Sequence, residues 1–329
     1  MTFLQAEKKR QTVFKLTSNY FTKAARKPGL YRSKLQPFCL PIEEAHQNLF
    51  PPIRDAAIDY FSKNQIVWHS GPLPDMPSNH LCSSQVFCVN FLFPFFDKPE
   101  ALKSLLLLIF PDIHRILPIE NENQYIAFEW IGDQNYLNEK PSLNNERKRG
   151  LGTTSIDAVV LLETTSNEHQ FVLIEWKYAE FYQNQYLRFS QGGTDRSLLY
   201  KPLLTSENCP IRKDLLQSFD DLLYDPFYQM LRQQLLAYKI EQIHKENVQI
   251  ATVLHLYTNK NRDLIKVTSP NLQAIGNTSF EVWKSLVKDQ RLFKNFSIEN
   301  LFASFSIERF PDFFGWWDYI KKRYSWITK

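Results

Sequence analysis

The chain of 329 residues is 43% hydrophobic and 22% charged, with a formal net charge of +4. This composition excludes a disordered protein and supplies enough apolar side chains for a sizeable core, in one large domain or two ordinary ones. The four cysteines form neither a CxxC pair nor a cluster with histidine, which argues against a zinc site or a disulfide framework and favours a cytoplasmic location. No apolar stretch has the length that a signal peptide or a membrane span needs, so we expect no membrane contact.

Positive charge is concentrated at the start of the chain. Residues 1–35 hold nine lysines or arginines and one acid, a local charge of +8, so the total of +4 leaves −4 for the remainder. A basic arm of this kind could run along a phosphate backbone, with Lys8, Lys9 and Arg10 as the candidate contacts. A solvated, partly disordered tail explains the same pattern equally well.

The front third of the chain has helical patterns. Apolar spacing after a pair of prolines predicts a helix over about 52–63. Ser83 or Ser84 can cap a second helix that Pro94 ends, and a third helix is expected over 99–109.

The middle of the chain changes to strand patterns. Strands are expected over 124–130, 154–163 and 170–177, and a polar turn should join the last two into an antiparallel hairpin. A long helix follows, with Asp225 as its cap and Pro226 in its first turn.

The long helix should reach about residue 245. The pattern after it predicts one more strand, over 248–257. The last fifty residues mix aromatic and charged side chains, which is typical of two or three amphipathic helices. No linker separates these parts, so we expect one compact unit. Its expected parts are a basic arm (1–35), a helical N-terminal part (36–120), a core (121–260) and a helical C-terminal part packed on the core (261–329).

Three charged residues interrupt the apolar strands of the predicted hairpin. Asp157 lies in Ser-Ile-Asp-Ala-Val-Val, and Glu175 and Lys177 lie in Ile-Glu-Trp-Lys. Unpaired charge is costly to bury, so such residues indicate a bound cation or a reaction. Side chains alternate along a strand, so Glu175 and Lys177 share a face, and antiparallel pairing brings Asp157 to the same end of the sheet if the register allows. A cross-strand salt bridge is the structural alternative.

The ExK triplet alone is a weak signal, because it also occurs at Glu7 and Glu146 in charged surroundings. The apolar flanks distinguish the third occurrence. Two carboxylates without nearby histidines favour Mg²⁺, with Mn²⁺ as the alternative, and Asp157 and Glu175 are the predicted ligands. In phosphodiester hydrolysis a lysine beside the metal, here Lys177, can orient the attacking water or stabilise the developing charge.

The elements Ser-Ile-Asp-Ala and Glu-Trp-Lys-Tyr resemble the PD-(D/E)XK nuclease superfamily, and more closely a group of bacterial proteins regarded as restriction endonucleases. The resemblance extends over about residues 31–259 and includes the stretch from His80, the Phe-Glu-Trp around Glu129 and the helix from Tyr228. One departure is Ile156, where the superfamily often has proline.

This resemblance implies an α/β fold, a restriction-endonuclease-like mixed β-sheet core flanked by helices, with helical additions at both termini. It also implies that Asp157, Glu175 and Lys177 bind the metal and serve catalysis. The basic loop Arg147-Lys148-Arg149 directly precedes the first catalytic strand and could approach a phosphate backbone, although a solvated loop is the alternative.

Several other residues are candidates for supporting roles. Glu129 could be a further carboxylate on the metal side, with an edge-strand surface charge as the alternative. Gln229 and Gln233 share a helical face with Arg232, while Gln234 and Tyr238 form a competing QxxxY pattern on an adjoining face.

Gln85 and Ser84 open a helix whose N-terminus can receive a phosphate or a carboxylate, although a plain cap explains the serine as well. Of the histidines, His69 and His255 are expected in the core or on the surface, and only His80 has a weak claim to the site.

The sequence therefore predicts a Mg²⁺-dependent endonuclease that hydrolyses DNA, double-stranded in the simplest case, in a restriction or defence role. A homodimer is one way to cut both strands, although no segment defines a symmetric interface. Two alternatives stay open. One is a nucleic-acid-binding module that keeps the fold without cleaving, and the other is a nuclease acting on RNA or branched DNA.

Overall fold

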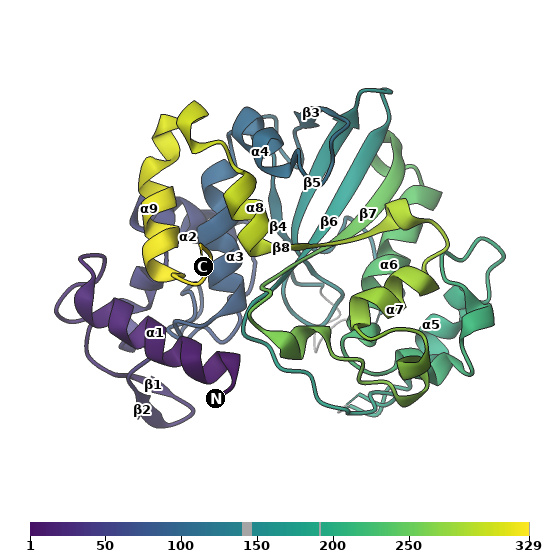
Figure 1. The fold of residues 1–329 in the computed structure, drawn as a ribbon, viewed down its shortest axis with the longest axis horizontal. Helices are drawn as coiled ribbons and strands as arrows, with labels where there is room; N and C mark the ends of the chain where they lie inside the picture. The colour runs from purple at the N-terminus through teal and green to yellow at the C-terminus, as the bar shows by residue number, and fades with distance from the viewer. Residues whose placement is uncertain (140–146, 191, 329) are drawn as a thin grey trace.

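The computed structural model describes residues 1–139, 147–190 and 192–328, and its centre is a mixed six-stranded sheet with helices on both faces (Figure 1). The strand order is β3-β5-β6-β7-β8, and β4 also pairs with β5. The strands are β3 (Ile113–Leu117), β4 (Ala127–Trp130), β5 (Ile156–Thr164), β6 (His169–Lys177), β7 (Val248–Tyr257) and β8 (Phe293–Ser297).

Strand β5 has two partners on one edge, because β4 pairs with its first half and β3 with its second half, both antiparallel. The hairpin of β5 and β6 is antiparallel, as the sequence predicts, with Ala158 opposite Ile174. Strand β6 then pairs in parallel with β7, and β7 in parallel with β8. The sheet is therefore mixed, and the carboxyl ends of β6 and β7 meet at the same edge.

Helices cover both faces of the sheet. α1, α2, α3, α4, α8 and α9 lie on one side and α5, α6 and α7 on the other, with the β1–β2 hairpin beside α1 (Figure 1). Short 3-10 helices such as Ile42–Asn48 occupy connections. The bounds are α1 (Phe3–Thr17), β1 (Gly29–Tyr31), β2 (Lys34–Gln36), α2 (Arg54–Lys63), α3 (Ser84–Leu92), α4 (Pro99–Leu106), α5 (Arg196–Leu204), α6 (Phe227–Gln242), α7 (Ser279–Leu286), α8 (Ile298–Ser304) and α9 (Phe314–Arg323).

Two hydrophobic cores lie on opposite faces of the sheet. Val160 and Ile174 pack into the core beneath α3, α8 and α9, whereas Val159 and Leu173 pack into the core beneath α6 and α7. Because both faces are covered, the central strands are apolar at nearly every position. A charged residue in these strands therefore has no solvent-facing side to occupy, except at the ends of the sheet.

Most elements expected from the sequence are present, including the helices near 52–63 and 84–92 and the strand over 248–257. The expected α/β architecture, a mixed sheet flanked by helices, is confirmed. One capping detail is wrong, because Pro226 itself occupies the N-cap of α6, after a cis peptide bond, and Asp225 does not cap this helix.

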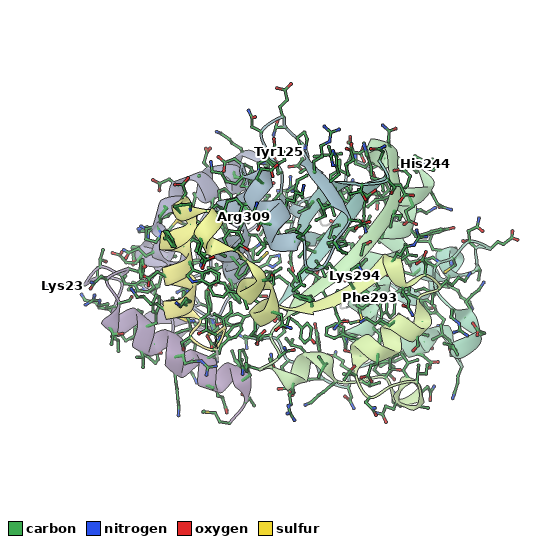
Figure 2. All side chains as sticks on the ribbon, turned by 45° about the horizontal axis from the view of Figure 1, so that its top comes forward. Lys23, Tyr125, His244, Phe293, Lys294 and Arg309 are labelled. Carbon is green, nitrogen blue, oxygen red and sulfur yellow. The ribbon has the colours of Figure 1, made fainter. Side chains whose placement is uncertain are left out.

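Two strands of the central sheet were missed, and so was the separate β1–β2 hairpin. β3 and β8 are short edge strands, and β8, which begins with Phe293 and Lys294, interrupts the region expected to be wholly helical (Figure 2). Their short length gives the sequence too little alternation to be recognised, and pairing with β5 and β7 defines them.

The basic segment 1–35 is not an extended arm. Its first half is the helix α1, which packs against α9, and Phe14 belongs to the hydrophobic core. Gln11 is buried, and the ammonium group of Lys15 donates hydrogen bonds to the carbonyls of Lys27 and Cys39 at 3.0 and 2.9 Å. The segment is thus built into the same folded unit as the sheet and is not a partly disordered tail.

No helix in the described part of the chain has both the length and the apolar character that crossing a membrane requires.

The buried guanidinium of Arg323 joins α9 to the rest of the helical layer. It donates to Gln11 Oε1 at 3.1 Å, to Asn48 O at 2.6 Å and to Leu81 O at 3.2 Å. We expect Arg323→Met to lower the free energy of unfolding by about 3 kcal/mol, because it leaves these buried acceptors unsatisfied. Chemical denaturation measures the change. Lys322→Gln, at an exposed neighbour, is the control, and a loss equal to that of the control would contradict this role of Arg323.

Candidate active site

Four neighbouring strands carry a polar residue at one level of the sheet. Glu175 in β6 pairs directly with His255 in β7. The register of β4 and β5, with Phe128 opposite Ala158, places Glu129 opposite Asp157. The result is a polar row across strands that are otherwise apolar.

Asp157 lies where the β5–β6 ladder ends. The last paired residues are Ala158 and Ile174. Beyond them the Asp157 side chain replaces a backbone acceptor, because its Oδ2 accepts a hydrogen bond of 2.7 Å from the backbone N–H of Trp176. This contact holds Asp157 beside Glu175. The expectation that the hairpin register brings Asp157 to the end of the sheet with Glu175 and Lys177 is confirmed.

A cavity of about 330 Å³, the acidic pocket, opens at this end of the sheet between the N-terminus of α3 and α6. It contains residues from strands, helices and loops that are far apart in the sequence. The lining residues are His69, Ser84, Gln85, Glu129, Gly150, Thr153, Thr154, Ser155, Asp157, Glu175, Trp176, Lys177, Glu180, Gln229, Arg232 and Gln233.

Glu175 and Lys177 form a buried ion pair, with 2.5 Å between Oε1 and Nζ. Both residues are only 6% exposed. Burial alone would lower the pKa of the Lys177 ammonium, but Glu175, with smaller contributions from Tyr182 and Glu180, outweighs burial and raises that pKa well above its ordinary value. Lys177 is therefore a fixed positive charge in the pocket.

The pocket has more acids than cations. Burial raises the pKa of Asp157 well above its ordinary value, and the nearby carboxylates of Glu175 and Glu129 raise it further. Burial also raises the pKa of Glu175, although Lys177 opposes this effect. The other cation in the lining, Arg232, is already paired with Glu139 at 3.2 Å. Such an arrangement favours a bound cation.

Glu129 is buried, with 2% exposure, and is not the surface charge considered as its alternative. Its φ of +47° lies in the left-handed region that a non-glycine residue rarely adopts, and this breaks the alternation of β4. Its carboxylate accepts hydrogen bonds of 2.8 Å from both Gln85 Nε2 and Ser155 Oγ. Local backbone strain and two donors thus hold this carboxylate in the pocket.

Helix α6 contributes three side chains to the pocket, Gln229, Arg232 and Gln233. Gln233 Oε1 accepts a hydrogen bond of 2.8 Å from Nε2 of His255, whose pKa burial and Lys177 lower well below its ordinary value. The imidazole is therefore neutral, and the amide nitrogen of Gln233 is left for other contacts.

The competing QxxxY pattern on α6 lies outside the pocket. Gln234 donates to the Leu292 carbonyl, and the Tyr238 hydroxyl pairs with that of Ser206. The packing of α6 therefore decides which of its two glutamine-bearing faces lines the pocket.

Helix α3 contributes its first turn. Ser83 is the cap, since its side chain accepts from the Val86 N–H, so Ser84 is free to donate to the Trp176 carbonyl at 3.1 Å. Gln85 reaches further and bridges Glu129 to the backbone of His69 and Val67. The side chains of Ser84 and Gln85 therefore connect α3 to β6 and β4.

Two residues of the basic loop point inward. Arg149 donates to the Glu129 carbonyl at 3.2 Å and to Glu120 at 2.9 Å, and Arg147 donates to the Ile131 carbonyl. Only Lys148 is exposed. The two guanidinium groups therefore hold the loop against β4, and the expectation that all three side chains face a phosphate backbone does not fit these contacts.

Gly150, which follows this loop, has φ of +79° and lies in the lining of the pocket. A Cβ here would lie 3.0 Å from the Val67 carbonyl and 3.4 Å from Glu129 Oε2. The glycine is required both by its backbone conformation and by this close approach.

Sequence reasoning missed two histidines of the site. His69 approaches the Gly150 carbonyl at 2.9 Å and Glu129 Oε2 at 3.8 Å, and His255 adjoins Glu175. Neither lies in a recognisable motif. The parallel register of β6 and β7 places His255 there, and no pattern within 248–257 predicts this register.

The donor set fits Mg²⁺ or Mn²⁺. Asp157 Oδ1 and Glu175 Oε2 take part in no hydrogen bond or ion pair within the described residues, so each carboxylate has an oxygen to offer. Oxygen ligands suit these ions, and Mg²⁺ usually keeps several waters and needs few protein ligands. A complete cage is not present, because the described ranges contain no group of three or more His, Cys, Asp or Glu arranged around one ion position.

The mixed sheet, its flanking helices and the acid–lysine cluster at its edge define a restriction-endonuclease-like α/β protein. The sequence model of a family described as "Restriction Endonuclease associating with ARP" matches residues 8–325, and the chain belongs to this family. No curated protein and no solved structure matches the chain.

The negative charge of Asp157 should lower the free energy of unfolding when no cation is bound. Because its pKa is raised on folding, the ionised carboxylate destabilises the folded state at neutral pH. Asp157→Asn keeps an oxygen for the Trp176 N–H and removes the charge. We expect it to raise the free energy of unfolding in a chelating buffer at neutral pH by on the order of 1 kcal/mol.

Urea denaturation measures this change. Asp97→Asn is the matched control, because Asp97 is exposed and, within the described residues, pairs only with Lys98. The loss of its charge should therefore change stability little. A loss of stability in Asp157→Asn would mean that the carboxylate is held by favourable contacts that outweigh its burial and the repulsion.

Proposed function

We propose that this protein is a metal-dependent endonuclease of the PD-(D/E)XK type that hydrolyses DNA. The observation that carries the proposal is the convergence of Asp157, Glu175 and Lys177 from two adjacent strands into one cavity at the edge of the sheet. Membership of a restriction-endonuclease family supports the same conclusion.

Asp157 and Glu175 would hold the Mg²⁺ ion, or Mn²⁺ in its place, through Oδ1 and Oε2, which form no hydrogen bond or ion pair within the described ranges. When bound, the ion supplies Lewis acidity, polarising the phosphoryl oxygen and lowering the pKa of water in the site. Both carboxylates keep a second contact that orients them. The Trp176 N–H holds Asp157, and Lys177 holds Glu175.

Lys177 acts in this proposal as a positive donor and not as a base, because its pKa is raised. Its ammonium group can orient the attacking water and stabilise the negative charge that develops on the phosphoryl group. His255 bonds to the amide oxygen of Gln233, so the amide nitrogen of Gln233 offers a further donor. Gln229 lies one turn earlier on the same helix. Glu129 and Gln85 fix the wall of the pocket on the opposite side.

The proposed substrate is double-stranded DNA, in a restriction or defence role. Two cuts on opposite strands call for two active sites, and a symmetric dimer would supply them.

A nicking assay tests the proposal. Wild-type protein should convert supercoiled plasmid to nicked or linear DNA in Mg²⁺ or Mn²⁺ and should stop in a chelator. Asp157→Asn, Glu175→Gln and Lys177→Met should each lower the rate by at least about 100-fold, because each removes a ligand or a charge that acts on the transition state. Glu122→Gln, at an exposed glutamate outside the pocket, should retain the wild-type rate.

Thermal melts of each variant exclude unfolding as the cause. Equal nicking by the wild type and the three site variants would contradict the nuclease proposal. DNA binding without cleavage would favour a binding module, and faster cleavage of RNA or of a branched duplex in a parallel panel would replace double-stranded DNA as the substrate.

A further inference from the structure

A second cavity adjoins the acidic pocket. It has a volume of about 410 Å³, and the two cavities share His69, Ser84, Gln85 and Glu180 as a common wall. The residues of the second cavity that matter here are Lys8, Tyr31, Arg32 and His80, and we call it the basic pocket.

The two cations of the basic pocket are not neutralised by neighbours. Neither Lys8 nor Arg32 forms an ion pair with a carboxylate within the described ranges. Lys8 Nζ lies 4.4 Å from the centre of the Phe38 ring, and Arg32 lies 5.4 Å from the centre of the Tyr31 ring. Aromatic faces hold both cations in place without cancelling their charge.

Their placement follows from the fold of the first 35 residues. Arg32 is at the tip of the β1–β2 hairpin, where its φ of +48° and that of Ser33, +63°, form the tight turn. Lys8 lies on α1 one residue after Glu7, which is buried. Two segments of the basic N-terminal region thus bring one cation each to the same cavity.

His80 adds a neutral donor. Its Nδ1 accepts a hydrogen bond of 3.0 Å from the Cys82 N–H, so the proton of the neutral ring is on Nε2. Tyr31 and Phe38 pack against the ring, with centroids at 4.9 and 5.0 Å. Burial, with help from the charge of Lys8, lowers the pKa of His80 to about 4, so the ring stays neutral at physiological pH.

The common wall also favours anions on this side. It includes Ser84 and Gln85 in the first turn of α3, where the helix dipole is positive. Among the described residues, Glu180 is the one acid that lines the basic pocket, and its Oε2 accepts a hydrogen bond of 2.6 Å from the Tyr178 N–H. One cavity is thus acidic, and its neighbour is basic across a shared wall.

We infer that the basic pocket binds a backbone phosphate of the same nucleic-acid strand, next to the phosphate that is cut in the acidic pocket. The inference rests on the proposed function. The acids of the catalytic pocket repel a phosphodiester, so cations in a neighbouring pocket have to attract the strand. Phosphate contacts of this kind fix the position of a strand without reading its sequence.

The test compares two double variants that remove the same total charge. Lys8→Gln with Arg32→Gln removes both cations of the basic pocket. Lys23→Gln with Lys34→Gln is the matched control, since both lysines are exposed in the same basic segment and neither lines the pocket (Lys23 is at the outer edge of the molecule in Figure 2). Binding to a labelled DNA duplex is measured in a chelator across a salt series, so that no cleavage occurs.

We expect the pocket variant to bind about tenfold or more weakly at low salt. The slope of log Kd against log salt concentration should fall by about 1, because the variant no longer neutralises one phosphate. The control should keep both the affinity and the slope of the wild type. With Mg²⁺ and saturating DNA, the pocket variant should recover the wild-type kcat and show only a raised KM.

Substrate truncation locates the phosphate that is bound. On oligonucleotide duplexes shortened next to the cut on one side or the other, the difference in KM between the wild type and the pocket variant should vanish for one of the two truncations only. Competition with inorganic phosphate, at constant ionic strength, separates a site for free phosphate from a strand contact.

Three results would overturn the inference. These are equal weakening by both double variants, unchanged binding by the pocket variant, and a pocket variant that loses only its affinity for inorganic phosphate. If the wild type cleaves DNA while one of these results is found, the nuclease proposal stands and the basic pocket has no role in it. If the wild type neither binds nor cleaves nucleic acid, both proposals fail together.

Discussion

The central constraint in this structure is the burial of like charge at one end of a sheet that is covered on both faces. Asp157 and Glu175 lie on adjacent strands with Glu129 beside them. Glu175 and Glu129 are buried, and Asp157 is half-buried. Burial of this kind destabilises the folded protein unless partners hold each carboxylate. The Trp176 N–H, the Lys177 ammonium and the side chain of Gln85 are those partners. The remaining oxygens are what a divalent cation would take.

The surrounding architecture can be understood as the support for this cluster. Helix α3 contributes Ser84 and Gln85 at its start, and α6 contributes Gln233, so the pocket is held from both layers of helices. On one side α1, α9 and the β1–β2 hairpin form a continuous layer through buried contacts of Arg323 and Lys15. This layer places positive charge beside the acids, and the opposite charges of neighbouring cavities are a consequence of the fold.

Much of the site could be predicted from the sequence because the strands that carry it follow local rules. Alternation predicts that Glu175 and Lys177 share a face, and the short polar turn of the hairpin brings Asp157 to them. The same rules fail where an interaction is long-range. His255 reaches Glu175 through parallel pairing over a connection of some seventy residues. The arginines of the loop at 147–149 look like surface charges in the sequence, yet they bind backbone carbonyls of β4.

The sequence by itself determined the hairpin, the acids and lysine on it and the concentration of basic residues in the first 35 positions, because alternation, turn chemistry and charge are local properties of the chain. Tertiary structure alone decided which side chains complete the pocket. The positive φ of Glu129, the choice of Gln233 over Gln234 and the meeting of Lys8 with Arg32 all depend on how separate elements pack, and packing is a property of contacts between residues distant in the chain.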